Sequence, residues 1–127
     1  IHWYNGLRFA LENRSIFIKS PKLDDLFEKY AEEMGEEVID DDFGYGSTDT
    51  GNVSHIVPTI HPHIKIGSRN LVGHTHRFRE AAASIHGDQA LIRVAKILAL
   101  MGLELIENEE LFNEIIEEHT HIKGHVK

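Results

Sequence analysis

The 127-residue chain contains no cysteine. Without thiols there is no disulfide framework and no thiolate metal ligand, so any bound metal would be held by nitrogen and oxygen atoms. The absence of cysteine also fits a reducing compartment, and we expect a cytoplasmic protein. No stretch reaches eighteen apolar residues, and the opening IHWYNGLRF lacks the charged region, apolar core and cleavage site of a secretory signal. We therefore expect no membrane partner.

Positive charge is also scarce, because 13 Lys and Arg stand against 21 Asp and Glu, for a net charge of −8. Such a chain would repel phosphate backbones, which argues against nucleic acid as a partner. The length suits one domain, residues 1–127, and no repeat or linker divides it. The chain starts without an initiator Met and on strand-like residues, so we expect a piece of a longer protein.

Familiar catalytic signatures are missing: there is no nucleophile elbow, P-loop, dinucleotide fingerprint or His-Glu-x-x-His helix. What the chain has instead is histidine, ten in all. Six of them form His-x-His pairs, at 61 and 63, 74 and 76, and 119 and 121. In a strand the two members of such a pair lie about 6.6 Å apart on one face and can reach one metal. For the pair at 61 and 63, a polar strand face is the simpler explanation. The pair at 119 and 121 lies beyond the expected end of the last helix, and we assign it no role.

Three helices are expected. The segment SPKLDDLFEKYAEEMG, residues 20–35, has a capping Ser20, Pro21 in the first turn, apolar residues at helical spacing and a terminating Gly35. Asp88 is expected to cap a helix over 89–106 that is buried on most sides, and Asn108 a helix over 109–118 whose apolar residues face inward. The adjacent glutamate pairs are interpreted as solvated faces: 32–33, 36–37, 109–110 and 117–118.

Short strands are expected between these helices. NVSHIVPTI, residues 52–60, is rich in β-branched residues and HIKI, residues 63–66, alternates, with Pro58 and Pro62 marking edges or breaks. Residues 36–51 are expected to be an exposed strand end and loop, and residues 67–87 give mixed signals. Strands beside two or three helices predict an α/β fold.

The order of GSTDTGNVSHIVPTIHPHIKI (46–66), GHTHRFREAAAS (73–84) and ALIRVAKILALMGLELI (90–106) resembles one family. It is similar to the C-terminal part of the zinc-dependent aminoacylases, carboxypeptidases and aminobenzoyl-glutamate hydrolases, in particular the aminoacylase-like dipeptidases and amidohydrolases. The resemblance covers about residues 20–118. It implies a partial catalytic domain of a zinc-peptidase-like α/β fold without its lid, with residues 1–15 a candidate for the end of that lid.

The resemblance also implies roles for four residues. In that family two divalent metals, commonly zinc, bind at strand ends, and the last ligand is a His in a Gly-His-Thr phrase, which matches His74. A neutral imidazole after Gly73 can approach a metal closely, with Thr75 or a carbonyl orienting its other nitrogen. Asp49, Asn52 and His61 would lie near the substrate. The alternatives are a surface loop for His74, an Asx-type turn for the loop residues and a strand-end imidazole for His61.

Two functional interpretations follow. In the first, the chain is the C-terminal segment of a metal-dependent amidohydrolase or dipeptidase acting on a dipeptide or N-acyl amino acid, inactive alone because a catalytic metal needs about three protein ligands. None of its own residues is then assigned as the catalytic base. In the second, it is a non-enzymatic remnant or interaction domain whose histidines bind metal incidentally. A domain lacking its sheet partners should expose a large apolar patch, so we expect a homo-oligomer.

Overall fold

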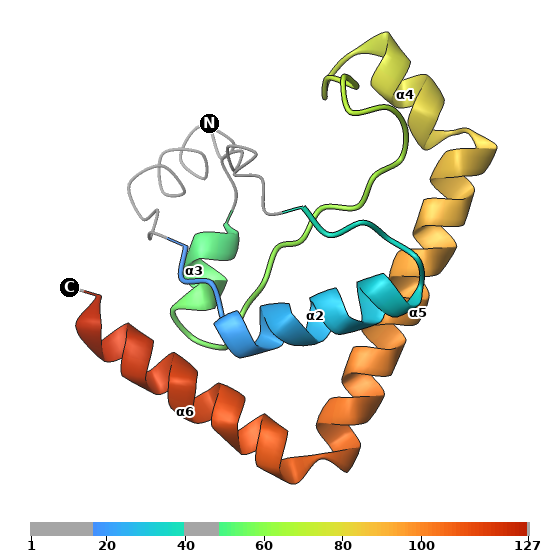
Figure 1. The fold of residues 1–127 in the computed structure, drawn as a ribbon. Coiled ribbons are helices and arrows are strands. Elements are labelled where there is room, and N and C mark those ends of the chain that lie inside the picture. The colour runs from blue at the N-terminus through green and yellow to red at the C-terminus, as the bar shows by residue number, and fades with distance from the viewer. Residues whose placement is uncertain (1–16, 40–48, 127) are drawn as a thin grey trace, which may run out of the picture.

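The computed structural model describes residues 17–39 and 49–126. The order of elements is α2 (Pro21–Glu33), α3 (Thr50–Ser54), α4 (His76–Ala82), α5 (Ile85–Glu107) and α6 (Glu109–His125). Figure 1 shows α5 and α6 meeting at an angle, with α2 in the opening between them and α4 at the far end of α5. Helix α2 contacts both α5 and α6.

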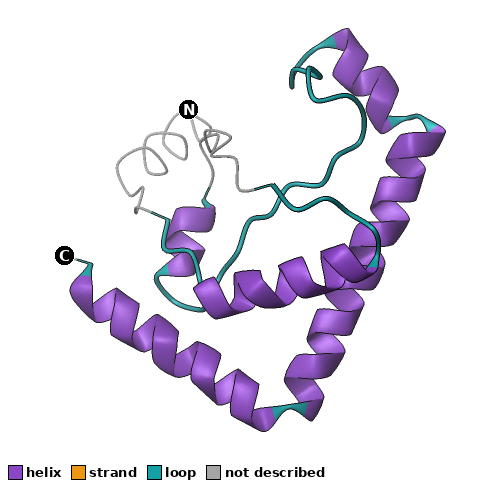
Figure 2. Ribbon diagram, in the orientation of Figure 1, coloured by secondary structure: helices purple, strands orange, loops and turns teal. Residues whose placement is uncertain are grey.

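The described residues are helices joined by loops, so the α/β prediction is wrong for this part of the chain (Figure 2). Residues 50–54 form a helical turn, and residues 55–75 run without a strand. One isolated parallel bridge, between Lys19 and Thr59, is the nearest approach to a sheet in the described ranges. A strand is stable only when another strand pairs with it, and Pro58 and Pro62 remove two of the donors needed for pairing. The expected end of the lid and most of the loop at 36–51 lie outside the described residues.

Helix α2 begins and ends where the sequence predicts. Pro21 occupies its first turn, and Gly35 follows its end with φ +81°, a conformation that glycine adopts without strain. The expected cap differs in its chemistry, because the Ser20 hydroxyl makes no capping hydrogen bond and is buried with no partner among the described residues. The Ser20 backbone is bonded instead, with its N–H donating to the Thr59 carbonyl over 3.0 Å.

The core lies where α2 crosses α5. Leu26, Phe27 and Ala31 of α2 pack with Ile97 and Met101 of α5. Burying a large apolar side chain stabilises a fold by about 1.5–3 kcal/mol, so this contact is the main apolar contribution that joins the two helices.

Helix α5 starts earlier than predicted. Ser84, and not Asp88, is its N-cap, and the Ser84 hydroxyl accepts from Gly87 N over 3.3 Å. A Cβ on Gly87 would lie 2.5 Å from the Ala82 carbonyl oxygen, so the tight entry from α4 requires glycine here. Asp88 lies instead in the first turn, where its negative charge favours the helix start.

The outer face of α5 is exposed, so the prediction of burial on most sides is also wrong for the described chain. Ile106 is 83% exposed and Leu91 65% exposed. With other exposed residues of α5 they form an apolar stripe on the side of the helix that faces away from the core. The stripe consists of Ile85, Leu91, Ile92, Leu98, Leu103 and Ile106. The homo-oligomer expected to cover such apolar surface stays a prediction.

Helix α6 begins as predicted and ends later. The Asn108 side chain accepts from Leu111 N over 3.0 Å, which confirms the expected cap. Ile115 is buried as predicted, but Phe112 and Ile116 are exposed, so the inward-facing prediction is wrong for these two. The helix continues beyond residue 118 to His125. None of the described helices is long and apolar enough to cross a membrane.

The two faces of α5 are expected to respond differently to truncation. Ile97→Ala empties a fully buried site and should lower the free energy of unfolding by about 2–5 kcal/mol. Leu98→Ala is the matched control on the adjacent exposed face, at 52% exposure, and should cost no more than about 0.5 kcal/mol. Urea unfolding followed by circular dichroism measures both. Equal losses would show that the outer face of α5 is covered in solution.

Candidate functional site

The loop that carries Asp49 and Asn52 is a single helical turn, α3. Asp49 is the N-cap residue of α3, but its side chain makes no capping hydrogen bond. Its backbone carbonyl accepts from the Asn52 N–H over 3.0 Å. Gly51 and Ser54 are buried, whereas the Asp49 side chain is exposed. The turn therefore presents a carboxylate outward on a backbone whose inner side is packed.

Ser54 anchors this turn through its hydroxyl. The Ser54 Oγ donates to the Gly51 carbonyl over 2.6 Å and accepts from Ile18 N over 2.9 Å. Ser54 is fully buried, so both bonds are shielded from water. The turn is thereby joined to the segment that leads into α2.

A second anchor comes from the far end of the chain. His119 of α6 is only 5% exposed, and its Nε2 lies 2.6 Å from the Ser54 carbonyl oxygen. A carbonyl can only accept, so His119 Nε2 carries the proton and donates. The sequence prediction gives His119 no role because it ends the helix too early. Ile115, His119 and Ile122 continue the helical spacing of the inward face, and this signal is present in the sequence.

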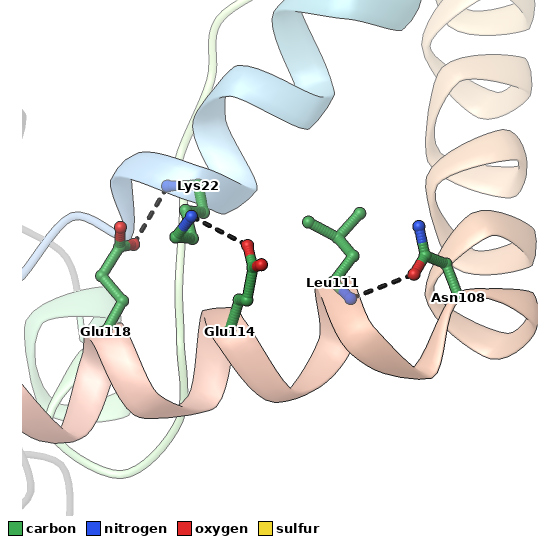
Figure 3. A network of polar contacts seen from close by, with 5 residues as sticks. All are labelled: Lys22, Asn108, Leu111, Glu114 and Glu118. Atoms are coloured by element: carbon green, nitrogen blue, oxygen red, sulfur yellow. Dashed lines mark hydrogen bonds and ion pairs between the residues drawn. The ribbon is translucent and has the colours of Figure 1, made fainter.

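The beginning of α2 is bonded to the same stretch of α6. Lys22 N donates to Glu118 Oε1 over 3.0 Å, and Lys22 Nζ donates to Glu114 Oε2 over 2.9 Å (Figure 3). The second pair is exposed and contributes little to stability, whereas the bond to Glu118 satisfies a free N–H of the first helical turn. Glu118 is therefore a structural acceptor, and the interpretation of the 117–118 pair as a solvated face is wrong for this residue.

His74, the predicted metal ligand, lies in an exposed turn immediately before α4. Its backbone has φ +60°, which is uncommon for a residue other than glycine and is found disproportionately at functional positions. The Thr75 hydroxyl accepts from Phe78 N as the cap of α4 and donates to the Val72 carbonyl, and its expected role in orienting the His74 ring stays a prediction. The turn that presents His74 is therefore fixed by the start of α4.

His61 and His63 lie in an extended segment and not in a strand. Both are exposed, and their ring centroids are 5.3 Å apart. The structure thus brings this pair together without a sheet. The role proposed for His61 at the substrate stays a prediction.

The four predicted site residues do not form one cluster. Asp49 and Asn52 share α3, which lies near α2 and α6, whereas His74 precedes α4 at the other end of the molecule (Figure 1). Within residues 17–39 and 49–126 no group of three His, Asp or Glu side chains could hold a metal ion. In these ranges His74 therefore belongs to no such group, and its role as a metal ligand stays a prediction.

An open groove of about 490 Å³ lies elsewhere, where α2, α5 and α6 meet, and holds none of the predicted site residues. Lys29 and Tyr30 both donate to Glu104 on its wall, Lys29 Nζ over 2.8 Å. The bond from Lys29, and next that from Tyr30, lowers the pKa of the Glu104 carboxyl. The same bond to Glu104 raises the pKa of Tyr30 above its ordinary 10.0.

Comparison with known proteins gives two relatives. Over 73 residues the chain is 47% identical to the Xaa-Arg dipeptidase of Homo sapiens and 41% identical to that of Mus musculus. Each match covers 58% of this chain, but only 16% of the human protein and 17% of the mouse protein. No family model matches the chain. The two matches support a relation to the peptidases and amidohydrolases, and they leave the subgroup undecided.

Because of the bonds to Glu104, we predict that the free energy of unfolding decreases in acid. Because the folded pKa of Glu104 is lowered, its interactions stabilise the fold above its ordinary value of 4.5 and are lost as the pH falls through the lowered folded pKa. The free energy of unfolding of the wild type should exceed that of Glu104→Gln at neutral pH, and the difference should shrink in acid. Urea unfolding between about pH 7 and pH 3 measures it.

The matched control for that series is Glu107→Gln, an exposed glutamate on the same groove. It removes the same charge without breaking the bonds to Lys29 and Tyr30. A difference between wild type and Glu104→Gln that stayed constant over the whole pH range would contradict the role given to these bonds.

Proposed function

We propose that this chain contributes part of the active site of a metal-dependent amidohydrolase or dipeptidase, which hydrolyses the amide bond of a dipeptide or an N-acyl amino acid. The observation that carries the proposal is the 73-residue match to two Xaa-Arg dipeptidases. The ordered phrases from the loop at 46 to Gly73-His74-Thr75 support it. In this proposal the chain is the C-terminal part of a cytoplasmic catalytic domain.

His74 would supply one ligand to a divalent metal, most simply zinc. An exposed imidazole on a turn that is tied to a helix start is available to a ligand and needs little reorganisation to meet it. The remaining ligands and the general base would come from residues outside the described ranges, since those ranges hold no three-ligand group. Of the described residues, His74 would help to hold the metal, and the proton transfers of the reaction would fall to those other residues.

Asp49 and Asn52 would contact the substrate. The turn α3 exposes the Asp49 carboxylate while Ser54 holds its inner side to α6 and to the segment before α2. A carboxylate held in this way suits a cationic group on the substrate. His61, which is exposed in the segment after α3, would face the same substrate.

The charge of the chain favours a basic substrate over an acidic one. The relatives are named for cleavage next to arginine, and this chain carries a net charge of −8. An acidic surface attracts small cations and raises their local concentration at an active site. We therefore propose dipeptides with a basic residue as the first substrates to try.

A second candidate function is a non-enzymatic interaction domain with incidental metal binding by histidine. The exposed apolar stripe of α5 and the absence of a three-ligand group in the described ranges both favour it. Both candidate functions are compatible with self-association into a homo-oligomer through this apolar surface.

The test uses the complete product of the gene that encodes the chain, purified with bound metal. Hydrolysis of dipeptides ending in Arg, Lys and Ala is measured together with metal content by mass spectrometry. His74→Ala should lower kcat/KM by about 100-fold or more and reduce the metal content, because a directly bound ligand is lost. His76→Ala, an exposed histidine two positions later, is the matched control and should keep both.

Two results would count against the proposal. Activity and metal content that are the same in His74→Ala as in the wild type would remove His74 from the site. A wild-type protein that cleaves none of these dipeptides, nor N-acyl amino acids, would favour the non-enzymatic candidate.

A further inference from the structure

The end of α6 brings together two histidines that the His-x-His spacing does not pair. Because α6 runs to His125, His121 and His125 are four residues apart on a helix and lie on one face. Their ring centroids are 4.5 Å apart with the ring planes tilted by 52°, and both side chains are exposed. His119, in contrast, points to the buried side of the same helix.

The protonation of the His125 ring is set by the backbone. His125 Nδ1 lies 2.8 Å from the His121 carbonyl oxygen, which can only accept, so Nδ1 carries the proton and donates. In the neutral ring Nε2 then has a free lone pair. A histidine that ligates a metal through one nitrogen while donating the other N–H to a backbone carbonyl is the usual arrangement in metal sites.

The position on the helix also favours a cation. His125 lies in the last turn, where the unpaired carbonyls carry partial negative charge, and the whole chain is acidic. Lys123 in the same turn opposes this effect. Two imidazoles on adjacent turns of one helix are a known way to hold a divalent metal. Each ring nitrogen must then come within about 2.0–2.1 Å of the same ion.

We infer that His121 and His125 form a two-imidazole site for a divalent late transition metal such as Ni²⁺, Cu²⁺ or Zn²⁺, with water in the other positions. The site is separate from His74 and independent of the proposed dipeptidase activity. Metal bound there favours the folded last turns of α6, the helix that carries His119 to Ser54.

Calorimetric titration with Ni²⁺ near neutral pH tests the site in the purified protein. The wild type should bind one ion at this site, and His125→Ala should weaken that binding by about tenfold or more. His63→Ala is the matched control, because it breaks the other close histidine pair, and should bind like the wild type. Ni²⁺ should also raise the melting temperature of the wild type and of His63→Ala more than that of His125→Ala.

His74→Ala separates this site from the proposed catalytic ligand, and it should bind Ni²⁺ at the α6 site unchanged. Because His121 and His125 are exposed, circular dichroism should show His125→Ala folded. The inference is overturned if no Ni²⁺ binds, if His125→Ala binds like the wild type, or if His63→Ala or His74→Ala removes the binding.

Discussion

The position of the α3 turn, which carries Asn52 and follows Asp49, depends on Ser54. Its hydroxyl bonds Ile18 and Gly51, and its carbonyl accepts from His119. One buried residue therefore joins the segment before α2, the turn α3 and the C-terminal part of α6. Each bond contributes about 0.5–1.5 kcal/mol, but leaving a buried partner unpaired costs about 1–3 kcal/mol, so the three segments are held as a unit.

The features that could be predicted from sequence are those set by local chemistry. Pro21 and Gly35 mark the ends of α2, and Asn108 marks the start of α6, because proline, glycine and a capping amide act on their own turn of backbone. The predicted start of α5 is wrong because serine and aspartate both commonly cap helices, so the sequence alone does not choose between Ser84 and Asp88. The close approach of Gly87 to the end of α4 favours the start at Ser84.

The features that could not be predicted depend on partners distant in sequence. A β-branched run such as residues 52–60 becomes a strand only if another strand lies beside it, and in the described ranges it meets only the bridge from Lys19 to Thr59. The outer face of α5 resembles a buried helix for the same reason, since its apolar pattern does not reveal whether anything covers it. The role of His119 escapes prediction because its partner, the Ser54 carbonyl, is 65 residues away. The roles of Asp49, Asn52, His61 and His74 stay predictions, because the matched stretch spans about a sixth of the relatives, at 16% and 17%.

Amide hydrogen exchange at Ile18 tests the Ser54 link most directly, because that N–H donates to the Ser54 hydroxyl. Protection of Ile18 should approach that of Phe27 in the core, and His119→Ala should reduce it more than it reduces the protection of Phe27. His119→Gln, which keeps a donor at the same reach, and His121→Ala on the exposed face should both preserve it. An Ile18 amide that exchanges as fast as an unstructured peptide, or that His119→Ala leaves unchanged, would contradict the account.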